Sequence, residues 1–187
     1  VPQTVISEWK KIEGRFETHQ FVDDSKEVLL LASQIMQHRF PNMVPSDEAV
    51  HRHTAHIRAV GLFAGFSDEE LSSVMRAAWP VLPASLYVLP RIASRVAQNE
   101  RTLFSYLFSV DGKTLLSPAD VYDYFSDLMR TDATVGGTYH HWLETESTLA
   151  KADSEAEERV IKSLSLLGLG LGGERARVSR KLLSYAS

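Results

Sequence analysis

Cysteine is absent from this chain of 187 residues, which excludes disulfide bonds and thiolate chemistry. A chain that uses no cysteine is typical of a cytoplasmic protein, and we expect that location. No hydrophobic run approaches the roughly 18 consecutive apolar residues that a membrane span needs, so a membrane is not an expected partner. The chain also begins at Val1, without a methionine or a signal-peptide pattern, which favours a segment excised from a longer protein.

Excess positive charge is lacking too. The chain has 20 Lys and Arg residues against 24 Asp and Glu residues, a formal net charge of −4, so no general nucleic-acid footprint is expected. Only the closing segment is locally basic, through Arg175, Arg177, Arg180 and Lys181, and its contact with nucleic acid stays open. With 44% hydrophobic and 24% charged residues, the composition is that of an ordinary globular protein.

Motifs of nucleophilic catalysis and phosphate binding are missing. The chain has no Gly-x-Ser-x-Gly elbow for a serine nucleophile. The glycine-rich run at 167–173 lacks the Lys-Ser/Thr pair of a phosphate-binding loop. Gly168 and Gly170 begin a dinucleotide-type spacing, but the third glycine and the preceding strand are absent. We therefore expect a loose connection between two helices in this run.

The strongest candidate for a metal site in the sequence is a group of histidines. His51, His53 and His56 lie within one expected helix, but His51 and His53 point apart there and no His-Glu-x-x-His motif is present. The pattern favours a solvated polar face with one stacking histidine, and a metal-dependent hydrolase is the weaker alternative. His140 and His141 are adjacent and diverge on a helix, so at most one of them could join a site.

What the chain does have is helical periodicity with helix-start signals from end to end. Ser46, the Ser67–Glu70 capping box and Ser117 followed by Pro118 each mark a helix start. We predict an all-α fold, an irregular bundle of about nine or ten helices in one domain spanning 1–187, with one short extended connector near 15–22. A sub-boundary is expected at 131–137, with 138–187 as a helical C-terminal portion. The expected helices cover residues 4–12, 25–39, 47–60, 67–79, two within 86–109, one after Ser117, and 139–151, 154–167 and 174–186.

The stretch at 86–109 should organise the core. Its first half carries an apolar stripe at helical spacing, interrupted by Pro90, so the helix should begin near Leu89 or kink there. Asn99 suits an N-cap and opens a second helix, with the corner at 98–100. We expect that helix to bury a face made of Leu103, Phe104, Leu107 and Phe108, with Tyr106 to one side.

Residues 99–107, Asn-Glu-Arg-Thr-Leu-Phe-Ser-Tyr-Leu, carry a resemblance. They look like the "NERTLFSFL" segment of large bacterial ATP-binding proteins that have an N-terminal P-loop NTPase domain of the AAA/STAND type, several of them tied to anti-phage defence. Further stretches resemble these proteins in the same order, the last of them before a winged-helix-like region. These stretches are 8–17, 86–90, 117–125 and 159–167.

The chain has neither a Walker A lysine loop nor a Walker B strand, so the resemblance implies the helical region that follows the nucleotide-binding core. Such a region would be a non-catalytic lid or regulatory module without a cofactor of its own. ATP and Mg²⁺ would belong to the parent protein. Its partners would be the ATPase core of the same chain and neighbouring subunits of an oligomer.

The resemblance suggests site residues at Arg15, Asn99, Glu100 and Arg101, with the two arginines reaching phosphates or a neighbouring subunit. A surface charge at Arg15 and an ion pair beside a cap at Arg101 are the plainer alternatives. A stand-alone helical protein-interaction or nucleic-acid adaptor domain is the alternative function. A large exposed apolar patch, where the missing core would dock, would favour the ATPase module, and a complete polar surface would favour the adaptor.

Overall fold

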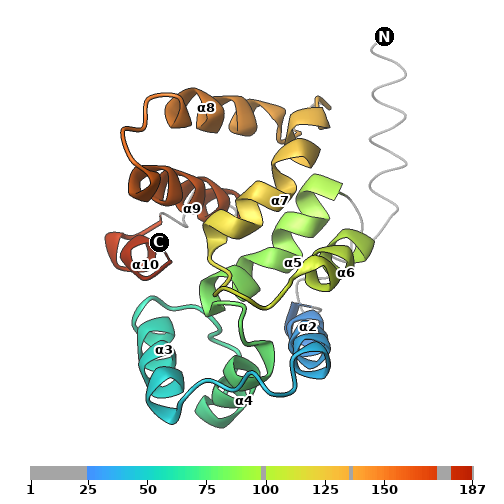
Figure 1. Ribbon diagram of the computed structural model, residues 1–187, viewed down its shortest axis with the longest axis vertical. Helices are drawn as coiled ribbons and strands as arrows, with labels where there is room; N and C mark the ends of the chain where they lie inside the picture. Colours follow the sequence, from blue (N-terminus) through green and yellow to red (C-terminus); the bar gives the residue numbers. More distant parts are fainter. Residues whose placement is uncertain (1–24, 98–99, 135–136, 172–177, 187) are drawn as a thin grey trace, which may run out of the picture.

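Nine helices make up the part of the chain that our computed structural model describes, which is residues 25–97, 100–134, 137–171 and 178–186 (Figure 1). The all-α prediction is confirmed there. The expected helix at 4–12 and the connector at 15–22 lie outside the described residues. The helices are α2 (Ser25–Arg39), α3 (Asp47–Ala59), α4 (Asp68–Ala78), α5 (Pro83–Ala97), α6 (Glu100–Ser109), α7 (Pro118–Thr131), α8 (Tyr139–Leu149), α9 (Glu155–Leu171) and α10 (Arg180–Ala186).

Serine side chains start three of these helices as the sequence predicts. Ser46 Oγ accepts a hydrogen bond from the Ala49 amide at 3.2 Å, at the start of α3. At α4 the capping box is complete, because Ser67 Oγ accepts from the Glu70 amide and the Glu70 carboxylate accepts from the Ser67 amide. At α7 the Ser117 amide and hydroxyl both donate to Asp120. These bonds satisfy amides that the first helical turn leaves without partners.

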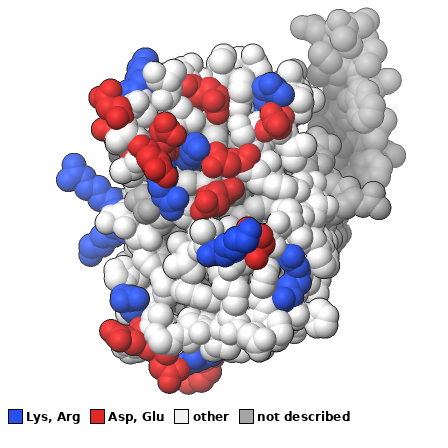
Figure 2. Space-filling model, viewed as in Figure 1, with Lys and Arg blue, Asp and Glu red and all other residues white. Residues whose placement is uncertain are grey.

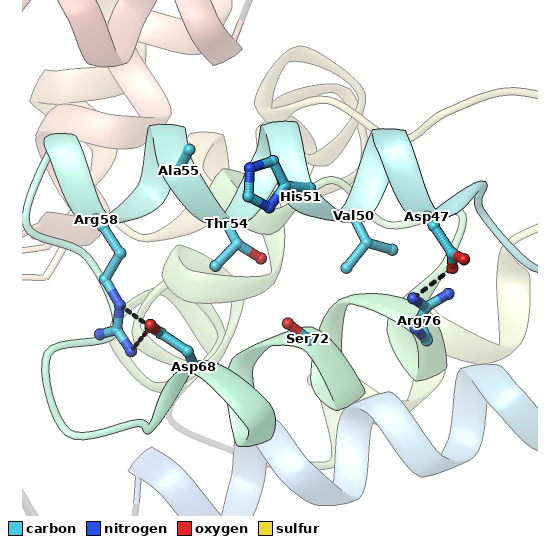
Figure 3. A pocket seen from close by; sticks show the side chains of 9 residues that line it. All are labelled: Asp47, Val50, His51, Thr54, Ala55, Arg58, Asp68, Ser72 and Arg76. Carbon is cyan, nitrogen blue, oxygen red and sulfur yellow. Dashed lines mark hydrogen bonds and ion pairs between the residues drawn. The ribbon is translucent and has the colours of Figure 1, made fainter.

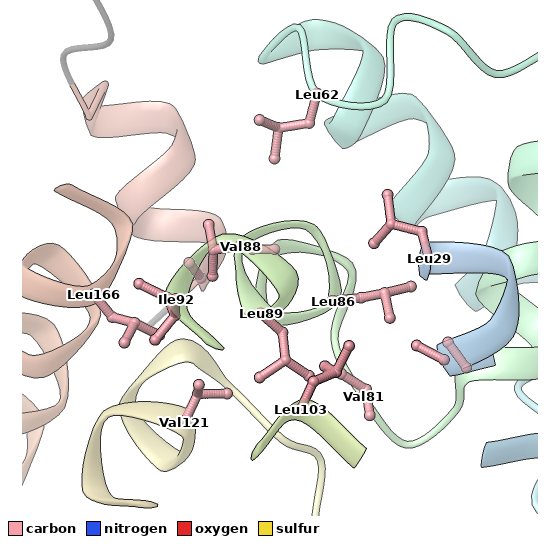
Figure 4. Packing of buried hydrophobic residues seen from close by; sticks show 14 of the residues in the cluster. Leu29, Leu62, Val81, Leu86, Val88, Leu89, Ile92, Leu103, Val121 and Leu166 are labelled. Carbon is pink, nitrogen blue, oxygen red and sulfur yellow. The ribbon is translucent and has the colours of Figure 1, made fainter. Parts of the chain in front are cut away.

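Helix α5 is the centre of the fold. In Figure 1 it runs between a lower group, α2 to α4, and an upper group, α7 to α9, with α6 alongside. Its residues Leu86, Val88, Leu89 and Ile92 are fully buried and meet side chains from both groups (Figure 4). The predicted buried stripe on this helix is therefore confirmed. Helices in contact with α5 are α2, α3, α4, α6, α7, α9 and α10.

Two details of the 86–109 pair differ from the sequence prediction. Helix α5 begins at Pro83 and continues through Pro90, so the predicted start near Leu89 is wrong. On α6 the buried residues are Leu103, Tyr106 and Leu107, whereas Phe108 is 61% exposed. Tyr106 packs against α7, and its ring centroid lies 4.8 Å from that of Tyr124 on that helix. Packing on α7, which spacing within one helix cannot reveal, selects the buried face.

The glycine-rich run is helical where the structure describes it. Helix α9 continues to Leu171, so the predicted loose connection starting at residue 167 is wrong for 167–171. Gly170 explains the difference: a Cβ atom placed there would lie 2.6 Å from Cβ of Val88 on α5. The absence of a side chain thus allows α9 to approach α5 closely, and this tertiary contact offsets the low helix propensity of glycine.

Candidate functional site

The structure describes no side chain of the four site residues that the resemblance suggests. Arg15 and Asn99 lie outside the described residues. Glu100 and Arg101 form the start of α6, but only their helical backbone is described. Their roles therefore stay predictions.

Histidine and aromatic side chains gather where α10 meets α3. Nδ1 of His53 lies 2.6 Å from the hydroxyl of Tyr185, and the His56 ring stacks on the Tyr185 ring at 5.2 Å with an interplanar angle of 11°. Trp79, after α4, closes the group with its ring 5.9 Å from that of His53. We call these four residues the His–Tyr cluster. It holds the short helix α10 on the domain. His56 is the one stacking histidine that the sequence predicts, and His53 adds edge contacts to Trp79 and Tyr185.

Metal chemistry gains no support from this arrangement. His51 does not join the His–Tyr cluster and lines a groove on another side of α3. Within the described residues, no group of three His, Cys, Asp or Glu side chains is placed to hold a metal ion. The cluster is a packing contact with titratable members.

Acidification should weaken the His–Tyr cluster. Burial lowers the pKa of His53 below its usual 6.5, and the charges of Arg52 and His56 lower it further. A histidine whose pKa is lower in the folded protein contributes its stability above about pH 6.5, and this contribution is lost as the pH falls through the folded pKa. We expect the melting temperature to fall between about pH 7.5 and about pH 5.5, and His53→Gln to flatten that dependence. His38→Gln on the exposed surface of α2 is the control, and an equal flattening by both variants would contradict the assignment.

A groove of about 490 Å³, lined mainly by residues with polar or charged groups, lies between α3 and α4 (Figure 3). An ion pair closes each end: Arg58 with Asp68 at 2.8 Å, and Arg76 with Asp47 at 2.6 Å. Between the ion pairs, side chains of α3 face Ser72 of α4. The lining residues are Asp47, Val50, His51, Thr54, Ala55, Arg58, Asp68, Ser72 and Arg76.

The charged side chains of this groove form ion pairs and hydrogen bonds within the protein. Arg58 also donates to the carbonyl oxygens of Phe63 and Phe66, which ties the α3–α4 turn to α3. Arg76 has Asp47 as its partner, and the Asp47 side chain is 92% exposed, so this ion pair is weak and replaceable. Arg76 is therefore the cation of this groove whose partner is easiest to displace, and the contacts that we observe include no nucleophile activated by a base.

Sequence reasoning missed a polar cluster between α8 and α9. The Ser165 hydroxyl lies 2.7 Å from the Thr145 hydroxyl and 2.9 Å from Nε2 of His141. Ser165 and Thr145 are buried, at 8% and 5% exposure, so a substrate cannot reach this Ser–His pair and its effect is to join the two helices. The i, i+4 spacing of His141 and Thr145 was the available signal. His140 is exposed and lies apart from this cluster, with its ring 5.9 Å from that of Tyr139.

Comparison with protein-family models, curated proteins and solved structures finds no match to this chain. Among the described residues, no helix has the length and apolar character needed to cross a membrane.

Proposed function

We propose that this chain is a non-catalytic helical module of a bacterial P-loop ATPase of the kind tied to anti-phage defence. It would pack on the nucleotide-binding core and couple the nucleotide state to a downstream effector or sensor. The resemblance of 99–107 and of the ordered stretches around it supports the proposal. The structural observation that carries it is the exposure of Phe108, on the helix that bears the resembling segment.

Phe108 is the most exposed aromatic side chain among the large hydrophobic residues of the described surface, at 61%. It stands at the last turn of α6, where Arg39 of α2 donates to the carbonyl oxygens of Leu107 and Val110. The Arg39 guanidinium lies 5.7 Å from the Phe108 ring. An aromatic ring held at a fixed helix end beside a cation is a suitable anchor for a docking partner.

Helix α6 can act as the coupling element. Its first turn carries Glu100 and Arg101, and its last turn carries Phe108, roughly 12 Å further along the helix axis. Leu103 and Leu107 are buried on the core, so the helix should move with the rest of the domain. A contact of the first turn with a phosphate or a neighbouring subunit that displaces α6 would then also displace Phe108, because the helix is rigid.

The intact gene product, in which we expect a P-loop core before Val1, provides the test. Phe108→Gln should change its ATP turnover by about fivefold or more, the lower end of typical coupling between sites, while leaving the melting temperature nearly unchanged. Val44→Gln is the control, because Val44 is 65% exposed in the loop before α3. A gene product without a P-loop core, or equal turnover in wild type and Phe108→Gln, would refute the proposal.

One observation favours the nucleic-acid adaptor as a second candidate. Arg180 and Lys181 on α10 are exposed, as is Arg52 on the adjoining α3. Glu48, one turn before Arg52 on α3, and the net charge of −4 oppose it. Binding of a labelled oligonucleotide that weakens steeply with salt would support the adaptor.

A further inference from the structure

An apolar groove of about 380 Å³ lies between the C-terminal end of α8 and the outer face of α9. It is separate from α6 and from the α3–α4 groove. Most of its lining is aliphatic, and its only charged members are Lys151 and Glu157. The lining residues are Thr148, Lys151, Ala152, Ala156, Glu157, Val160 and Ile161.

The groove continues as a stripe along α9. Val160 is 37% exposed and Leu164, one turn further on, is 45% exposed. With Ala156 before them and Gly168 after them they form an i, i+4 series about 18 Å long on one side of the helix. A Cβ atom at Gly168 would meet nothing within 4 Å, so this end of the stripe is open. A helix in a single domain normally turns such a stripe inwards, and α9 has a second, buried face as well.

The groove is preformed. The Ser165 hydroxyl joins His141 and Thr145 of α8, as described above, and these bonds set the spacing between α8 and α9. A partner would therefore not have to order the two helices on binding, which removes one cost of association.

Acidic side chains outnumber basic ones around the groove. Within the described residues, the structure shows no ion-pair partner for the exposed acidic side chains of α8, of the α8–α9 turn and of the first turn of α9. The basic residues of α9 are turned away: Lys162 pairs with Asp123 at 2.7 Å, and Arg159 donates to Ser117, both near α7. Figure 2 shows several acidic side chains, with Lys and Arg side chains among them, over the region where Figure 1 places α8 and α9. The acidic residues nearest the lining are Glu157, which lines the groove, Asp153, which follows Ala152, and Glu144, one turn before Thr148; Lys151 is the one basic residue of the lining.

We propose that the α8–α9 groove binds an amphipathic helix whose apolar face is flanked by Lys or Arg. The apolar face lies on Val160 and Leu164, and the basic residues face the carboxylate rim. The carbonyl end of α8, which carries partial negative charge, borders the same groove and favours the same cations. Helix-in-groove binding of this kind uses anchors at i, i+3 or i+4, and i+7 of the incoming helix. The groove and Phe108 lie on different helices, so each can be tested alone.

A fluorescent peptide of about 18 residues, or five helical turns, with a leucine face flanked by lysines is the probe. Its partner peptide has glutamate at every lysine position. We expect the lysine peptide to bind the domain about tenfold or more tightly than the glutamate peptide, and its affinity to fall between about 50 and about 500 mM salt. Val160→Gln with Leu164→Gln should weaken binding of the lysine peptide by about tenfold, because glutamine keeps helix propensity but removes the apolar anchors.

Leu31→Gln on α2 is the matched control, since Leu31 is also a helical leucine at 45% exposure. It should leave binding unchanged, and circular dichroism should show every variant folded. Equal binding of both peptides, equal loss with Leu31→Gln, or no binding of the lysine peptide at low salt would each overturn the proposal. Loss of ATPase coupling would not bear on it, because the peptide assay needs no nucleotide.

Discussion

Leu107→Ala should lower the free energy of unfolding by about 2–5 kcal/mol, the usual cost of removing a fully buried leucine side chain. Leu107 is 0% exposed and belongs to the core that α5 organises. The cost should stand near the upper part of this range, since α6 is held at its C-terminal end by Arg39 and cannot collapse freely into the cavity. Chemical denaturation followed by circular dichroism measures the change.

Phe108→Ala is the control for that experiment. The two residues are neighbours on α6, but Phe108 is exposed and its truncation should change the free energy of unfolding by less than about 0.5 kcal/mol. Similar losses for the two variants would show that α6 packs through a different face. Together with the turnover assay, this control separates a structural role of Phe108 from a docking role.

Gly170→Ala should lower the free energy of unfolding by about 1–2 kcal/mol in net, although alanine is the better helix former by about 1 kcal/mol. The new methyl group would lie 2.6 Å from Cβ and 2.9 Å from Cγ1 of Val88, and 3.3 Å from Cδ1 of Ile92. Cβ of Val88 is attached directly to the backbone of α5, so it cannot move aside without moving that helix. The strain should therefore exceed the gain in helix propensity.

Gly168→Ala should change the free energy of unfolding in the opposite direction to Gly170→Ala. Gly168 lies two residues earlier in α9, and a Cβ atom there has nothing within 4 Å. The substitution should raise the free energy of unfolding by up to about 1 kcal/mol, through helix propensity and a less flexible unfolded chain. Urea denaturation of both variants measures the pair. Two effects of the same sign would refute the close approach of α9 and α5 at Gly170.

Helix starts could be predicted from the sequence because they depend on neighbours in the chain. The bonds at Ser46 and Ser67 join residues three positions apart, so the residue types and their spacing suffice. The stripe on α5 was predictable for a related reason, since the helical period places Leu86, Leu89 and Ile92 on one face. The length of α5 could not be predicted, because packing on both sides keeps the helix continuous through Pro90.

Features that join distant segments could not be predicted in this way. The inward turn of Tyr106 depends on α7, and the helical course of α9 at Gly170 depends on Val88 of α5. The contact of His53 with Tyr185 joins residues 132 positions apart. Of the suggested site residues, Arg15 and Asn99 lie outside the described residues, so their proposed roles stay predictions.

The sequence by itself determined the all-α class, the main helix starts and the buried stripe of α5, because capping and helical periodicity are local properties of the chain. Only the tertiary structure decided which aromatic of α6 faces solvent, how a glycine lets α9 touch α5, and that α8 and α9 leave an apolar groove with an acidic rim. These features arise where helices far apart in the sequence meet, and their spacing is set by packing rather than by local preference.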